Sequence, residues 1–193
     1  MIEFISQLDF LQYDFMRNAL AAGLAASVLC GIIGIYVILN KIVFISDGIA
    51  HAAFGGIGLG YFLGYDPLAF GIASAILTAL GIGMVSSRGR ISEDTAIGVF
   101  MATGMALGIM LLTLSEGYAR DLYGYLFGNI LLVENRDILF AGGTLLLILL
   151  LLGLFYREWT ALTFDAETAE ATGIPVARMD ALFLSLLAFV VVV

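Results

Sequence analysis

Asp47 and His51 are the residues of this chain whose types and spacing could do chemistry inside a membrane segment. His51 is the only histidine, and Asp47 lies four residues before it, at the start of a long apolar stretch. Four residues is about one helical turn, so the carboxylate and the imidazole would share one helix face and could hold one ion together. Ionisable groups at membrane depth are costly and usually mark the path of a substrate. The spacing alone leaves open an alternative, a polar pair that closes a helix end or bonds a neighbouring helix.

The composition of the chain indicates an integral membrane protein. Of the 193 residues, 62% are apolar and 12% are charged, and the mean hydropathy is +1.07. Soluble globular domains carry roughly 25% charged residues. The apolar residues form continuous runs, not the alternating pattern of a β-barrel. We therefore expect an all-α, polytopic transmembrane helical bundle surrounded by membrane lipid. A formal charge of −8 without a basic stripe excludes a nucleic-acid partner.

Five apolar runs are predicted to cross the bilayer as helices, namely residues 18–39, 48–63, 68–85, 95–114 and 138–156. Pro67 is placed to start the third helix and Ser92 to cap the fourth. The tyrosines of residues 123–129 favour an interfacial or short re-entrant helix. A last run, residues 181–193, has only 13 residues, whereas a spanning helix needs about 20. We expect that residues 1–193 form a single transmembrane permease domain that stops inside its sixth span, as the N-terminal part of a longer chain.

The basic residues predict that the N-terminus lies outside the cell. With that orientation the inner loops hold five basic residues and the outer loops three, the direction that the positive-inside rule requires. The inner residues are Lys41, Arg88, Arg90, Arg157 and Arg178, and the outer residues are Arg17, Arg120 and Arg136. Residues 157–177 are then a cytoplasmic loop.

This loop contains the pattern of a short acidic helix. Asp165 is a good N-cap, Glu167 is favourable in the first turn, and Gly173 followed by Pro175 ends the element. A helix of about two turns is marginal on its own in water, so the adjoining spans or a partner must hold it. The pattern leaves two interpretations open: a docking element for a cytoplasmic protein, or a simple connecting loop.

The sequence lacks two common patterns of catalytic residues, a nucleotide-binding loop and a Ser-His-Asp triad. Lys41 is the only lysine, and no Gly-x-x-x-x-Gly-Lys pattern includes it, so a phosphate-cradling nucleotide loop of that kind is absent. The single histidine is already placed beside Asp47, which leaves no Ser-His-Asp arrangement. We expect that this chain is not an enzyme and that any ATP hydrolysis takes place on a separate partner chain.

Four stretches together resemble the membrane permease subunit of metal-ion ABC importers, the zinc, manganese and iron group. They are FISDGIAHA at residues 44–52, EDTAIG at 93–98, YLFGNIL at 125–131, and the segment 164–175 from Phe-Asp to Gly-Ile-Pro. They occur in the order and at the intervals of that family. One of them alone would be weak, but four in order are specific.

The resemblance implies a function for both groups of residues. Two permease subunits work with two ATP-binding cassette subunits in the prokaryotic inner membrane, and an extracytoplasmic metal-binding protein supplies the ion. By this likeness Asp47 and His51 belong to the translocation path. The ATPase would dock on the short acidic helix, at Asp165, Glu167, Ala169, Glu170 and Gly173.

We therefore expect the transmembrane subunit of an ATP-driven importer of divalent metal ions, with zinc as first choice and then manganese or iron. Asp47 and His51 would bind the ion transiently, and no cofactor would stay bound. One carboxylate and one imidazole suit zinc or manganese without separating them. His51 must be neutral to bind metal, so uptake should fail in acid. The alternatives are a permease for a chelated metal or cobalamin-like cofactor, and a non-transporting membrane scaffold.

Overall fold

The computed structural model describes residues 13–87, 89, 91–115 and 133–192. These residues form α-helices and no strand, which confirms the all-α prediction. The helices are α2 (Asp14–Leu39), α3 (Ile45–Leu63), α4 (Pro67–Ser87), α5 (Glu93–Leu114), α7 (Asn135–Leu154), α8 (Tyr156–Phe164), α9 (Ala166–Ala171) and α10 (Val176–Val192). The helix predicted within residues 123–129 lies outside the described residues.

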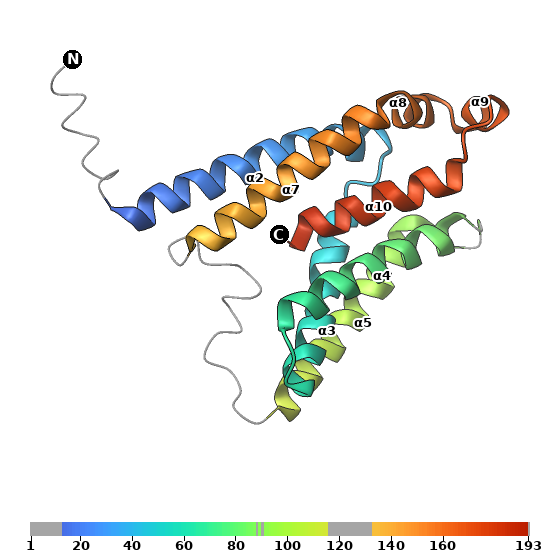
Figure 1. Cartoon of the computed structure of the whole chain (residues 1–193). Coiled ribbons are helices and arrows are strands. Elements are labelled where there is room, and N and C mark those ends of the chain that lie inside the picture. Colours follow the sequence, from blue (N-terminus) through green and yellow to red (C-terminus); the bar gives the residue numbers. More distant parts are fainter. Residues whose placement is uncertain (1–12, 88, 90, 116–132, 193) are drawn as a thin grey trace, which may run out of the picture.

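The helices form two groups that α10 joins (Figure 1). Helices α3, α4 and α5 pack as one bundle, and α2 runs beside α7. Helix α10 packs along α4 and α3, while α8 and α9 lie together beyond the end of α7. One apolar core contains side chains from both groups. Its most deeply buried large members are Ile45, Ile49, Ile82, Ile148 and Leu187.

Four of the described helices, α2, α4, α5 and α7, are long and apolar enough to cross a membrane. Helix α3, which carries Asp47 and His51, is not among them. Ten of its 19 residues are buried, against four of 26 in α2. The segment predicted as the second span is therefore a helix, but one enclosed largely by protein. Asp47 and His51 are exceptions to this burial, since both side chains remain partly exposed.

Several helix ends follow the predicted signals. The Ser92 hydroxyl accepts a hydrogen bond from the backbone N–H of Thr95 at 3.3 Å and caps α5. Gly64 ends α3 in the left-handed region, with φ of 72°, and Pro67 begins α4. A residue with a Cβ would be strained in that conformation.

Two boundaries differ from the sequence-based expectation. The fifth predicted helix corresponds to α7, which begins at Asn135 and ends at Leu154, and a further helix, α8, occupies Tyr156–Phe164, where a loop is predicted. The last helix begins at Val176 and not at residue 181, so it has 17 residues instead of 13. Arg178 and Asp180 are part of this helix, since its first turns lie at the end of the molecule where charged side chains remain exposed.

Candidate functional site

The Asp47–His51 pair occupies the first two turns of α3. The Asp47 Oδ1 lies 3.4 Å from the His51 Nε2, which confirms that the spacing of four residues brings the two groups together. The side chain of Asp47 is 67% exposed and that of His51 is 36% exposed within this chain. The same turns bury Ile45, Gly48 and Ile49, so the pair points away from the core side of α3. Both groups are therefore accessible to an ion approaching along this face.

Close packing between α3 and α5 fixes where this face lies. A Cβ added at Gly104 would come 2.5 Å from the Ala52 Cα, and one added at Gly55 would come 2.9 Å from the Gly104 carbonyl oxygen. Only hydrogen atoms at these positions allow the two backbones to approach so closely. One turn before Ala52, an added Cβ at Gly48 would collide with the Ile97 side chain. The pair is thus carried on a helix whose distance from α5 is set by glycine.

Helix α4 holds the opposite side of α3. The Ser74 hydroxyl donates to the backbone carbonyl of Ala53 at 3.2 Å, and it also lies 3.0 Å from the carbonyl of Gly71 on its own helix. Hydrogen bonds between helices of this kind add modest stability in a membrane. Helices α4 and α5 therefore pack against two sides of α3, and Asp47 and His51 lie on a strip of α3 that these helices leave uncovered.

The described part of the chain offers two side-chain ligands at this site and no more. No group of three or more His, Cys, Asp and Glu side chains within the described residues is arranged to hold a metal ion. A carboxylate oxygen and an imidazole nitrogen together can bind a divalent ion, whose further ligands would be water or groups beyond these residues. Such sparse ligation suits transient binding better than storage.

The predicted acidic helix is present as α9. The Asp165 carboxylate accepts hydrogen bonds from the backbone N–H groups of Glu167 and Thr168, at 3.1 and 3.2 Å, and from the Thr168 hydroxyl. These bonds, that of the Thr168 hydroxyl first, lower the pKa of Asp165 below its ordinary value. The helix ends as predicted, with Gly173 in the left-handed region at φ 91°.

The five residues predicted for docking do not all reach the surface. Asp165, Glu167, Glu170 and Gly173 are exposed, whereas Ala169 is 2% exposed and faces the rest of the chain. The backbone N–H of Ile174 donates to the Ala169 carbonyl at 3.1 Å, so this residue ties the end of α9 together. The exposed face of α9 is therefore acidic, and the buried Ala169 lies on the face that packs against the rest of the chain.

Trp159 on α8 is a structural residue that sequence reasoning missed. Its indole Nε1 donates to the backbone carbonyl of Met179 on α10 at 3.2 Å, and its ring lies 5.8 Å from that of Phe155 and 6.1 Å from that of Phe183. The side chain is 3% exposed. The available signal was the spacing of four residues between Phe155 and Trp159, which places two aromatic rings on one helix face.

These features together define a multi-pass α-helical membrane protein with a polar pair on an enclosed helix and an acidic helix beyond its spans. The chain belongs to the ABC 3 transport family, whose sequence pattern matches residues 12–193. This finding confirms the resemblance drawn from the four motifs.

Individual relatives agree with this assignment. The chain is 44% identical over 183 residues to the uncharacterized membrane protein slr2045 of Synechocystis, covering 95% of this chain and 64% of the relative. It is 39% identical over 189 residues to the manganese transport system membrane protein MntC of Halalkalibacterium halodurans, covering 98% and 64%. The chain thus spans less than two thirds of the length of these relatives.

A solved structure has the same fold. The structure of PsaBC from Streptococcus pneumoniae in complex with Fab matches with a TM-score of 0.81 and 34% sequence identity. The match covers 100% of this chain and 69% of the other. At that similarity the arrangement of α3 against α4 and α5 is a property of the shared fold.

Proposed function

We propose that this chain supplies transmembrane helices of the permease in an ATP-driven importer of divalent metal ions, and that Asp47 and His51 bind the ion in transit. The observation that carries the proposal is the 3.4 Å contact between the Asp47 carboxylate and the His51 imidazole on the uncovered strip of α3. Ionisable side chains on a membrane helix carry a cost in free energy, and they are usually found where they line the path of a substrate or ion. The membership of the chain in an ABC transport family supports the same role.

Manganese is the first candidate cargo. Zinc, named first in the sequence-based expectation, finds no support in the names of these relatives, whereas the Halalkalibacterium relative is named for manganese transport. The ligands themselves do not separate the two metals, because carboxylate suits manganese and imidazole suits zinc. Zinc binds a given site more tightly than manganese, so it should compete at this site even where manganese is the ion carried.

The partners follow from the same proposal. The chain has no phosphate-binding loop around its only lysine, so ATP hydrolysis belongs to a separate ATP-binding cassette subunit. That subunit would dock on α9, whose exposed residues include Asp165, Glu167 and Glu170. An extracytoplasmic metal-binding protein would deliver the ion, and a second permease copy would complete the path.

Uptake measurements on variants test this proposal. The full-length protein would be expressed with its ATPase and binding protein in cells that lack their own importers, and labelled manganese and zinc would be supplied, each alone and in competition. We expect manganese uptake that falls at least tenfold in both Asp47→Ala and His51→Ala. Asp14→Ala is the matched control, since this carboxylate is 94% exposed on α2 and pairs only weakly with Arg17 at 3.7 Å.

The outcomes separate the competing functions. Uptake that persists in both variants at normal protein levels would leave a transporter with its ligands elsewhere. Failure to carry either bare ion, with uptake of a chelated metal or a cobalamin-like compound, would favour the chelate permease. No uptake of any kind and no ATPase partner would favour a membrane scaffold.

A further inference from the structure

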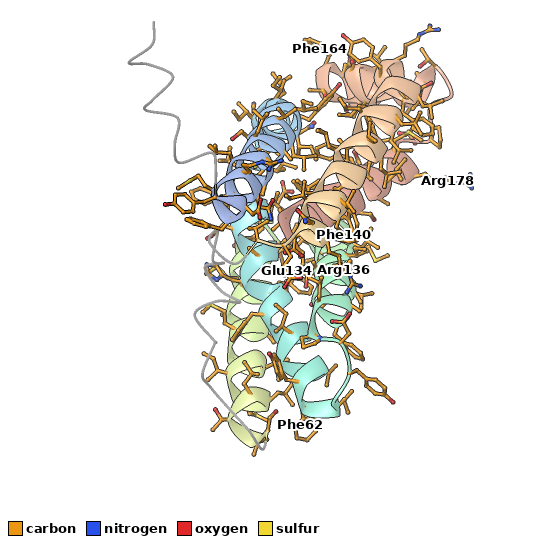
Figure 2. All side chains as sticks on the ribbon, turned by 60° about the vertical axis from the view of Figure 1, so that its left-hand side comes forward. Phe62, Glu134, Arg136, Phe140, Phe164 and Arg178 are labelled. Carbon is orange, nitrogen blue, oxygen red and sulfur yellow. The ribbon has the colours of Figure 1, made fainter. Side chains whose placement is uncertain are left out.

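The contact between Gly48 on α3 and Ile97 on α5 lies beside the Asp47–His51 pair. Gly48 directly follows Asp47, and Ile97 belongs to the stretch EDTAIG at residues 93–98. Figure 2 shows α3 between α5 and α4, with Phe62 of its last turn at one end of this bundle. Gly48 is in the first turn of α3, so this contact lies towards the other end.

A single side chain fills the space that Gly48 leaves on α3. The three atoms nearest to a Cβ added at Gly48 all belong to Ile97: its Cγ2, which would collide with the added atom, its Cβ at 3.5 Å and its carbonyl oxygen at 3.7 Å. Further along the same face of α3, Cβ atoms added at Gly55 and Gly58 would meet backbone atoms of α5 instead. The γ2 methyl group of Ile97 is therefore packed directly on the backbone of Gly48.

Ile97 is a rigid support for this part of α3. Its side chain is 5% exposed and belongs to the apolar core, as does that of Ile49, the residue after Gly48. Because isoleucine is branched at Cβ, it adopts nearly always one χ1 rotamer in a helix. The backbone of α5 therefore determines the direction of the γ2 methyl group.

The contact controls the direction in which both ligands point. Successive residues of a helix are turned by about 100°, so Gly48 faces about 100° from Asp47 and about 60° from His51. Movement of the first turns of α3 into a gap at Gly48 would therefore redirect the carboxylate and the imidazole together. A binding site keeps its geometry only when the residues behind its ligands are held by packing.

We propose that Ile97 is a positioning residue for the metal ligands: its γ2 methyl group, packed on Gly48, holds the first turns of α3 in the orientation in which Asp47 and His51 bind a divalent cation. This inference rests on the proposed function, because it requires that the pair binds the ion. Ile97 itself does not touch the ion. The stretch EDTAIG then has a role at the site, since it carries the side chain that supports the two ligands.

Manganese binding to the full-length protein in lipid nanodiscs tests the inference through the shape of residue 97. Ile97→Val keeps the γ2 methyl group and loses only the δ1 methyl group, so we expect a manganese affinity within twofold of wild type. Ile97→Leu keeps the number of carbon atoms but has no branch at Cβ, and it should weaken binding at least fivefold. A role in filling core volume alone predicts the reverse order, because leucine preserves the volume.

Exchange of the two side-chain sizes is a second test. Gly48→Ala alone brings a Cβ against the Ile97 Cγ2, and Ile97→Ala alone leaves a gap. In the double variant the two Cβ atoms would lie 3.5 Å apart, an ordinary van der Waals distance. We expect each single variant to weaken manganese binding at least fivefold and the double variant to recover to within threefold of wild type. Losses that add in the double variant would overturn the inference.

The nitrogen-14 coupling of the bound manganese separates positioning from a general loss of stability. We expect this coupling, from the His51 imidazole, to change in Ile97→Leu and to stay as in wild type in Ile97→Val. Ile148→Leu is the matched control, since Ile148 is 1% exposed on α7, which packs on α2. It should lower the temperature of unfolding about as much as Ile97→Leu does, with affinity and coupling unchanged.

The outcomes distinguish failure of this inference from failure of the proposed function. Ile97→Leu that binds manganese within twofold of wild type, with an unchanged coupling, would overturn the positioning role and leave Asp47 and His51 as ligands. Equal weakening in Ile148→Leu would also overturn it, because stability and not the contact with Gly48 would then determine binding. If manganese in wild type shows no nitrogen coupling that depends on His51, the proposed function fails first, and the positioning role fails with it.

Discussion

Trp159 on α8 and Met179 on α10 are joined by a hydrogen bond of 3.2 Å from the indole Nε1 to the backbone carbonyl. This bond ties the helices beyond the spans to α10, which in turn packs along α4 and α3. Helix α3 carries Asp47 and His51. A continuous set of packed helices therefore connects the acidic end of the molecule with the polar pair (Figure 1).

Removal of this hydrogen bond should weaken the contact between α8 and α10 without creating a cavity in the core. Trp159→Phe keeps an aromatic ring but loses the donor, so we expect the free energy of unfolding to fall by about 1 kcal/mol. Trp159→Ala also leaves a cavity, and the loss should reach about 3–5 kcal/mol. Chemical unfolding in detergent micelles measures both. An alanine variant as stable as the phenylalanine variant would show that the ring is not packed as described.

The close approach of α5 to α3 should depend on the absence of a side chain at Gly104. Gly104→Ala places a Cβ 2.5 Å from the Ala52 Cα, so the helices must separate. We expect a loss of about 1–3 kcal/mol in the free energy of unfolding, the usual cost of overpacking, together with reduced metal uptake. The free energy of unfolding is measured on the purified variant, and metal uptake is measured in cells that express it.

Gly98→Ala is the control for that prediction. Gly98 lies on the same helix with nothing within 4 Å of an added Cβ. Alanine is the better helix former by about 1 kcal/mol, so the variant should be as stable as wild type or slightly more so. Equal effects at both positions would show that helix propensity, and not the contact with α3, determines the result.

The stabilisation of α9 by its N-terminal cap, Asp165, should depend on pH only in the acid range. Hydrogen bonds from Thr168 and Glu167 lower the pKa of Asp165 in the folded chain. The stabilisation of α9 by this carboxylate is therefore complete above the ordinary aspartate pKa of about 4 and is lost as the pH falls through the lowered value. A carbon-13 NMR titration of the Asp165 carboxyl group, with the Thr168 amide signal as a second probe, measures this transition.

Two variants locate the cause of that shift. Thr168→Val removes the largest contribution and should raise the pKa of Asp165 towards its ordinary range. Asp165→Asn retains a good N-cap without a titrating group, so its α9 signals should not change in acid. A pKa that is unchanged in the valine variant would contradict the assignment to the Thr168 hydroxyl.

Local signals account for most of the helix boundaries. Ser92, Asp165 and Gly173 are positions whose side chain or backbone conformation starts or ends a helix regardless of distant contacts. The same holds for Asp47 and His51, because a spacing of four residues fixes their proximity within α3 itself. These features were predicted correctly because one helical turn contains everything that determines them.

Features that depend on distant residues escaped prediction. Helix α8 follows the apolar run that predicts α7, and what holds it is the hydrogen bond of Trp159 to Met179 of α10, a contact between residues far apart in the sequence. Glycine spacing alone does not tell which helix each glycine faces: Gly55 faces α5 at Gly104, whereas Gly56 faces α4 at Ser74. The burial of Ala169 likewise follows from contacts with other helices.

Pulsed EPR of manganese bound to the full-length protein reports the atoms that hold the ion, and so shows whether Asp47 and His51 bind it. We expect nitrogen-14 modulation from one imidazole in wild type, lost in His51→Ala, and at least tenfold weaker binding in Asp47→Asn. Asp14→Ala should leave both the modulation and the affinity unchanged. Manganese bound with the same nitrogen modulation and affinity in the His51→Ala and Asp47→Asn variants would contradict the assignment of this pair as the ligands of the transported ion.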